Sequence, residues 1–213
     1  LARKVVASAG EISRNSAIAV FGSGAIGALT LTFSDSFWFT AVEAEVYITS
    51  LFLTAFVFWS ILKWESVADH KDSLKWLVLI AYIIGLSIGV HMLNLLAIPA
   101  IVFVYYFKKF NPSLKGILIT GVVSIAILGF IMSVLIPGLL NLDWQFERFF
   151  VNTLGLPFHS GTIAFFVFLV AGITGGLYYS HKKQKVVLNT LLLAFTFMVI
   201  GYSSFFMLVI RSN

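Results

Sequence analysis

The chain has 213 residues, of which 60% are hydrophobic and only 11% are charged. A soluble domain carries about 25% charged residues, so the composition excludes a globule covered by water and indicates an integral membrane protein. The absence of cysteine excludes a disulfide framework and a thiolate metal site. The net charge of +5 lies mostly in short loops, which favours a topological explanation over a nucleic-acid partner.

The chain opens with residues 1–15, LARKVVASAGEISRN, which lack the apolar core and cleavage motif of a signal peptide. We expect a cytoplasmic loop or amphipathic segment entered from an earlier span, with both ends of the chain cutting through a longer protein. The first expected span, 16–33, is rich in small residues. Ser23 and Gly27 lie four apart in it, a spacing that allows close helix packing.

An acidic and aromatic stretch, SDSFWFTAVEAEVY, follows at residues 34–47. It carries Asp35, Glu43 and Glu45. Carboxylates beside a membrane span are costly to place and therefore indicate function. The aromatic triplet within the stretch is typical of a membrane–water boundary. We expect this loop on the non-cytoplasmic side, as part of the wall of a functional site.

Residues 74–107 stay apolar over 34 positions, too long for one ordinary crossing and right for two short ones. The predicted break is at His91 to Asn94, with Gly85 and Gly89 giving the preceding helix a close-packing face. The alternative is one long, tilted helix kinked at Pro99.

Further along, a fifth span ends at Pro137-Gly138, and residues 137–160 alternate acidic, basic and apolar side chains as an interfacial amphipathic helix does. Residues 211–213 are the expected start of an external segment. The sequence therefore predicts an all-α fold of about seven transmembrane helices, because the strand alternation of a barrel is missing. The expected spans are 16–33, 46–62, 74–90, 92–107, 116–136, 161–179 and 187–210.

Orientation follows from the basic residues. With seven spans, every lysine-bearing loop falls on one side, which the positive-inside rule makes cytoplasmic; six spans would divide these loops between both sides. The N-terminus is then cytoplasmic and the C-terminus external. The basic residues of these loops are Arg3, Lys4, Arg14, Lys63, Lys71, Lys75, Lys108, Lys109, Lys115, Lys182, Lys183 and Lys185.

Each candidate residue of the acidic stretch also has a structural interpretation. Thr40 and Glu43 have the spacing of a capping box at a helix start, and Asp35 is either an ordinary loop carboxylate or a ligand of a metal ion or substrate hydroxyl. Glu45 has no such structural explanation. His91 and Asn94, three apart, share a helical face. They form either a polar hairpin tip or part of a phosphate or sugar site.

Arg148 is the one well-placed external cation. It fits an anionic lipid phosphate, and pairing with Asp143 or Glu147 fits equally well. His159 is expected to be a loop residue. The chain has no Walker loop, HExxH, GxSxG or Cys/His cluster, and a coupled transporter would need more ionisable groups within the spans.

Two motifs carry a family resemblance: AEVY at residues 44–47 and GxxxGxHxxNLL at residues 85–96. With these motifs the chain resembles the DUF2723 family of multi-spanning bacterial proteins, related to the protein O-mannosyltransferases of the GT-C superfamily. The resemblance implies a partial GT-C-like module in the bacterial inner membrane. Its expected partners are membrane lipid, a polyprenyl-phosphate sugar (with mannose the expected sugar) and a protein acceptor on the non-cytoplasmic side, with no nucleic acid.

The resemblance also implies roles. A carboxylate base deprotonates the acceptor hydroxyl, for which Glu45, Asp35 and Glu43 are the candidates, and other groups hold the leaving phosphate or the sugar. The candidate substrate-binding residues are His91, Asn94, Arg148 and Tyr47. No metal ligand is assigned, and a divalent cofactor stays open.

The chain departs from the superfamily in one respect. The usual base lies in a first external loop that is absent here, so the acidic stretch would belong to the second external loop. A non-catalytic membrane subunit or scaffold of a larger assembly is the alternative function.

Overall fold

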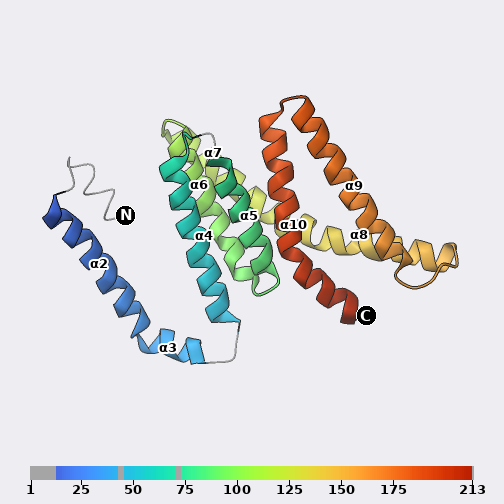
Figure 1. Cartoon of the computed structure of the whole chain (residues 1–213), viewed down its shortest axis with the longest axis horizontal. Helices are drawn as coiled ribbons and strands as arrows, with labels where there is room; N and C mark the ends of the chain where they lie inside the picture. The colour runs from blue at the N-terminus through green and yellow to red at the C-terminus, as the bar shows by residue number, and fades with distance from the viewer. Residues whose placement is uncertain (1–12, 43–45, 71–72, 213) are drawn as a thin grey trace. The chain divides into compact units, whose positions relative to one another are not determined.

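The computed structural model describes residues 13–42, 46–70 and 73–212, with side chains described up to residue 203. Throughout these ranges the chain forms helices and turns without a strand, which confirms the predicted all-α fold (Figure 1). In chain order the helices are α2 (Arg14–Thr32), α3 (Asp35–Val42), α4 (Tyr47–Val67), α5 (Leu74–Ile88), the 3₁₀ helix η2 (Met92–Leu96), α6 (Ala97–Lys109), α7 (Leu114–Phe130), the π segment η3 (Ile131–Leu135), α8 (Ile136–Arg148), the π segment η4 (Phe149–Thr153), α9 (Ser160–Lys182) and α10 (Val186–Ser212).

The chain divides into two compact units, residues 1–48 and 49–213. In the first, α2 begins where the Ser13 hydroxyl accepts a hydrogen bond from the Ser16 amide at 3.2 Å. Within this unit α2 buries none of its residues, and a Cβ atom on Gly27 would meet nothing within 4 Å. The apolar surface of α2 is therefore open, as expected for a helix whose solvent is lipid.

Within the described residues, six helical segments are long and apolar enough to cross a bilayer, which makes the chain a multi-pass membrane protein. The segments are Arg14–Thr32, Tyr47–Val67, Met92–Lys109, Leu114–Thr153, Ser160–Lys182 and Val186–Ser203. The expected span at 74–90 is not among these six segments; it coincides with α5, which has 15 residues and is about 22 Å long. That length falls short of a hydrocarbon core of about 30 Å.

Between α5 and α6 the chain leaves the helical path. α5 ends at Ile88, His91 is extended, and η2 leads into α6. This part of the chain is thus two helices and not one long helix kinked at Pro99. Pro99 lies in the first turn of α6, where a missing amide hydrogen costs little.

Two glycines allow α5 and α10 to cross in backbone contact. A Cβ atom on Gly85 would overlap the backbone of Met198, and one on Gly201 would lie 2.5 Å from the carbonyl oxygen of Tyr82. The small residue predicted at Gly85 therefore sits at the closest helix crossing of the second unit. The other member of that expected face, Gly89, lies past the end of α5.

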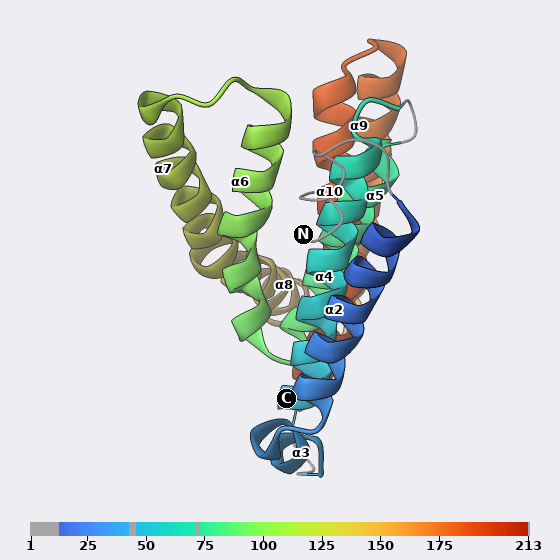
Figure 2. The ribbon, with the colours of Figure 1, turned by 90° about the vertical axis from the view of Figure 1, so that its left-hand side faces the viewer.

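The expectation that Pro137 ends a helix is wrong. Helical structure continues from α7 through η3, α8 and η4, covering residues 114–153. In η3 the Ile136 amide donates to the Ile131 carbonyl; this wider turn just before Pro137 absorbs a residue that an α-helix excludes. The 40 residues would be about 60 Å long if straight, twice the hydrocarbon core. After η3, however, α8 runs across the direction of α9 and α10 (Figures 1 and 2).

The lysine-bearing turns of the second unit lie together at one end. The α4–α5, α6–α7 and α9–α10 turns share this end in both views, and η2 lies toward the other (Figures 1 and 2). Residues of α4 and of the turn after it contact α6 at this end. The rings of Trp64 and Tyr105 stack at 5.2 Å, and the Lys109 ammonium donates to the Ala68 carbonyl at 2.9 Å. The shared end is a structural finding, and its assignment to the cytoplasm is a proposal.

Candidate functional site

Of the acidic stretch, the structure describes Asp35 and Tyr47, whereas Glu43 and Glu45 lie outside the described residues. Asp35 is exposed in the first turn of α3. A carboxylate there is favoured by the positive end of the helix dipole, so its position has a structural explanation. Tyr47 is the exposed first residue of α4.

The predicted capping box is wrong at its first residue. Thr40 lies inside α3, and its hydroxyl donates to the Ser36 carbonyl at 2.8 Å. A capping threonine would instead precede the helix and accept from an amide. The preference of threonine for bonding back to the preceding turn explains the difference.

His91 and Asn94 lie in one turn but not on one helical face, which corrects the helical-face prediction. His91 has φ −163° and caps η2, its Nδ1 accepting from the Leu93 amide at 3.1 Å. Because Nδ1 accepts, the neutral ring carries its proton on Nε2. The ring is half-buried, and the extended backbone separates its direction from that of Asn94.

Asn94 faces the protein interior. Its exposed fraction is 1%, and neither polar atom of its amide has a hydrogen-bond partner within the described ranges. Ser60 of α4, with an exposed fraction of 0%, has an unpartnered hydroxyl too. Buried amides without partners cost free energy. The burial also means that a ligand could reach Asn94 only by entering between helices.

A second polar group lies where α8 meets α9. The Glu147 carboxylate of α8 accepts from the amides of His159 at 2.6 Å and Thr162 at 3.0 Å. His159, the residue before α9, is in the left-handed region (φ 69°) and gives no side-chain cap. Glu147 therefore supplies from α8 the acceptor that the start of α9 lacks.

Arg148 pairs with neither of its two predicted carboxylate partners, Asp143 and Glu147. Among the described residues Arg148 has no ion pair; instead its guanidinium lies 5.3 Å from the centre of the Trp144 ring, and both side chains are exposed. Asp143 is half-buried and interacts with Thr162. Arg148 thus presents a cation backed by an aromatic ring, a pair suited to an anion at a membrane surface.

The structure brings some predicted residues together and separates others. His91 and Asn94 share a turn, Arg148 belongs to α8, and Asp35 and Tyr47 belong to the first compact unit. No group of three or more His, Asp or Glu side chains that could hold a metal occurs in the part of the chain that the structure describes. The capping role of Glu147 was not predicted, because its partners are amides 12 and 15 positions away.

Residues 1–114 match the family model described as the protein O-mannosyl-transferase TMEM260 N-terminal domain. The chain belongs to this family. The TMEM260 N-terminal match extends through α6, so it includes the acidic stretch and the His91–Asn94 turn, while the α8–α9 corner lies outside it. None of the curated proteins or solved structures compared with the chain matches it.

Proposed function

We propose that the chain is part of a membrane glycosyltransferase that moves a sugar, mannose in the first instance, from a polyprenyl-phosphate donor to a protein acceptor. The observation that carries the proposal is the match to a protein O-mannosyl-transferase N-terminal domain, which includes the whole acidic stretch. We place the reaction on the non-cytoplasmic side of a bacterial inner membrane, opposite the lysine-bearing turns, with the N-terminus inside and the C-terminus outside.

The reaction breaks the bond between the sugar's anomeric carbon and the phosphate oxygen, and forms a bond from that carbon to the acceptor hydroxyl oxygen. A carboxylate takes the hydroxyl proton, and hydrogen-bond donors or cations stabilise the departing polyprenyl phosphate. Glu45 is our first candidate for the base because Asp35 has a structural role at the start of α3. Glu43 is the third candidate.

The remaining candidates would position substrate. His91, held in its turn by the bond from the Leu93 amide, would bind a phosphate or sugar oxygen through its ring. Arg148, resting on Trp144, offers a guanidinium to a phosphate. Tyr47 would contact substrate from the start of α4, and Asn94 would act from within the protein, supporting its turn.

The test is sugar transfer by membranes containing the full-length protein, supplied with labelled polyprenyl-phosphate mannose and acceptor. Loss of a general base lowers the rate by about 10²- to 10⁴-fold, so Glu45→Gln is expected to fall by at least about 100-fold. Asp69→Asn removes an exposed carboxylate at the lysine-bearing end and is expected to keep full activity. Full activity in Glu45→Gln would remove Glu45 from the mechanism. Full activity in Asp35→Asn and Glu43→Gln as well would exclude the acidic stretch as the source of the base.

A further inference from the structure

An apolar groove lies between α5 and α10, and none of the candidate catalytic residues is among its described lining. Its volume is about 530 Å³, within the range of about 300–1,000 Å³ found for ligand pockets. Leu79 and Tyr82 line it from α5, and Leu193 and Phe197 line it from α10. Its walls are almost entirely apolar, so an apolar chain lying in the groove would leave no polar group of the protein unpaired.

One end of this groove is basic. Lys75 itself lines the groove. Beyond Leu74 and Val78, which line both spaces, a second hollow of about 130 Å³ continues to His181 and Lys185 at the α9–α10 turn. Together the two spaces are apolar along α5 and α10 and basic at one end, where α5 begins, α9 ends and α10 begins. We call this end, lined by Lys75 and Lys185, the cationic mouth.

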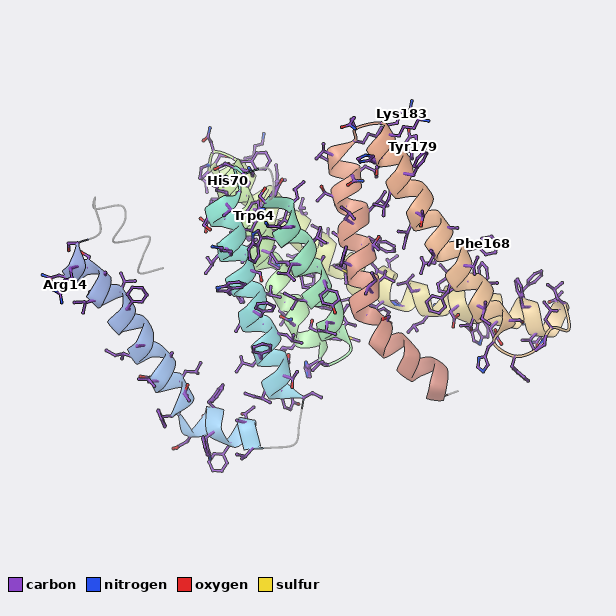
Figure 3. The ribbon with its side chains drawn as sticks, viewed as in Figure 1. Arg14, Trp64, His70, Phe168, Tyr179 and Lys183 are labelled. Carbon is purple, nitrogen blue, oxygen red and sulfur yellow. The ribbon has the colours of Figure 1, made fainter. Side chains whose placement is uncertain are left out.

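The cations at this mouth are not neutralised by the described residues. Neither space includes an aspartate or glutamate in its described lining, and no described carboxylate forms an ion pair with Lys75 or Lys185. The Lys185 ammonium lies 5.1 Å from the centre of the Tyr179 ring and donates to its hydroxyl at 3.3 Å, which holds it in place with two donors remaining. Tyr179 and Lys183 mark the same turn in Figure 3.

We propose that this groove binds an anionic phospholipid of the surrounding bilayer, with an acyl chain along α5 and α10 and the phosphate between Lys75 and Lys185. The acyl chain enters the groove from the apolar interior of the bilayer, so it gains packing contacts and no transfer out of water, and the ammonium groups add charge-assisted hydrogen bonds to the phosphate. An apolar groove alone would accept any lipid, whereas its cationic mouth selects a negative headgroup. This site is independent of the sugar-transfer reaction proposed above.

The experiment measures retained lipid by native mass spectrometry of the full-length protein, taken from nanodiscs containing equal phosphatidylglycerol and phosphatidylcholine. The test variant is Lys75→Gln/Lys185→Gln. The control, Lys63→Gln/Lys115→Gln, removes the same charge from exposed positions near the ends of α4 and α7. A third variant, Val78→Trp, fills the junction of the two spaces without changing charge.

The wild type and the charge control are expected to retain phosphatidylglycerol preferentially. The preference should fall about tenfold in Lys75→Gln/Lys185→Gln, equivalent to about 1.4 kcal/mol, and Val78→Trp should lower total retained phosphatidylglycerol. An equal loss in the test and control variants would assign the preference to overall charge and overturn the site. Undiminished retention by Val78→Trp would overturn the acyl-chain position, as would displacement of the lipid by millimolar inorganic phosphate alone.

Discussion

Glu147 shows how a single residue can hold two elements together without a sequence signal. Its carboxylate caps α9 from α8, and Gly161 makes room for the approach, because a Cβ atom there would overlap the Glu147 backbone. The residue pattern predicted that α8 is amphipathic. It could not predict this contact, because the partners are main-chain amides that every residue carries.

The capping role predicts a loss of stability on substitution. Glu147→Ala is expected to lower the free energy of unfolding by about 1–2 kcal/mol, because loss of a helix cap costs that much; Glu147→Gln, which keeps one neutral acceptor, should lose less. The measurement is thermal unfolding in detergent, followed by tryptophan fluorescence. Gln145→Ala, exposed on the same helix, is the control, and equal midpoints for it and Glu147→Ala would contradict the cap.

His91 shows that residue spacing predicts a shared face only where the backbone is helical. The sequence located the interruption between two apolar helices at His91, and the chain does leave the helix there. The three-residue spacing to Asn94 predicted a shared face only if the backbone were helical. The extended φ of His91 breaks that condition, so one side chain caps a turn while the other is buried.

At the scale of elements, proline was the misleading signal. The sequence predicts a helix end at Pro137, yet the π segment before it lets the helix continue and change direction into α8. Among the predicted small-residue faces, Gly85 lies in a close crossing, whereas Gly27 meets nothing within 4 Å. The face expected at Gly85 lies in the crossing with α10, although its partner Gly201 could not be found from periodicity within α5.

The close crossing of α5 and α10 predicts that a large side chain at Gly85 strongly destabilises the protein. Gly85→Leu is expected to destabilise the protein by about 3 kcal/mol or more, at the upper end of overpacking costs, because the side chain would meet backbone that cannot move aside. Gly129→Leu, at a position with nothing within 4 Å, is the matched control and should fold normally. Detergent-solubilised yield and melting midpoint measure both. Normal midpoints in both variants would refute the close crossing.

The contact between the α4–α5 turn and the end of α6 predicts a pH dependence. Asp69 pairs with Lys108 at 3.0 Å and Lys109 at 3.2 Å, and hydrogen bonds from these ammonium groups lower the pKa of Asp69 below its usual 3.8. A pKa lowered by folding stabilises the protein above the unfolded value, and this contribution is lost as the pH falls through the folded value.

Asp69→Asn is therefore expected to lower the melting midpoint slightly at pH 7, since the pair is exposed, and to have no effect once the pH is well below 3.8. Midpoints of both proteins measured across this range provide the check. A difference that stays constant down to the lowest pH would show that Asp69 does not act through its charge.

At the scale of the whole molecule, composition alone predicted the class of protein. An interior and a surface that are both apolar leave lipid as the only suitable solvent, and helix follows because lipid satisfies no backbone group. Hydropathy located most of the apolar helices for the same reason, but it did not predict that helical structure continues through Pro137. The arrangement of the helices was not predictable, because it depends on a few close contacts, such as Gly85 with α10, that leave a weak trace in hydropathy.

We expect the acidic stretch and the lysine-bearing turns to face opposite sides of the membrane. These 213 residues contain no cysteine, so a single introduced cysteine is the only thiol in this part of the protein, and its label is followed on the purified protein. Ser36→Cys and Gln184→Cys, both exposed positions, are treated with a membrane-impermeant maleimide before and after permeabilisation. We expect Ser36→Cys to be labelled in intact cells and Gln184→Cys only after permeabilisation. Labelling of both variants under the same condition would contradict the proposed orientation.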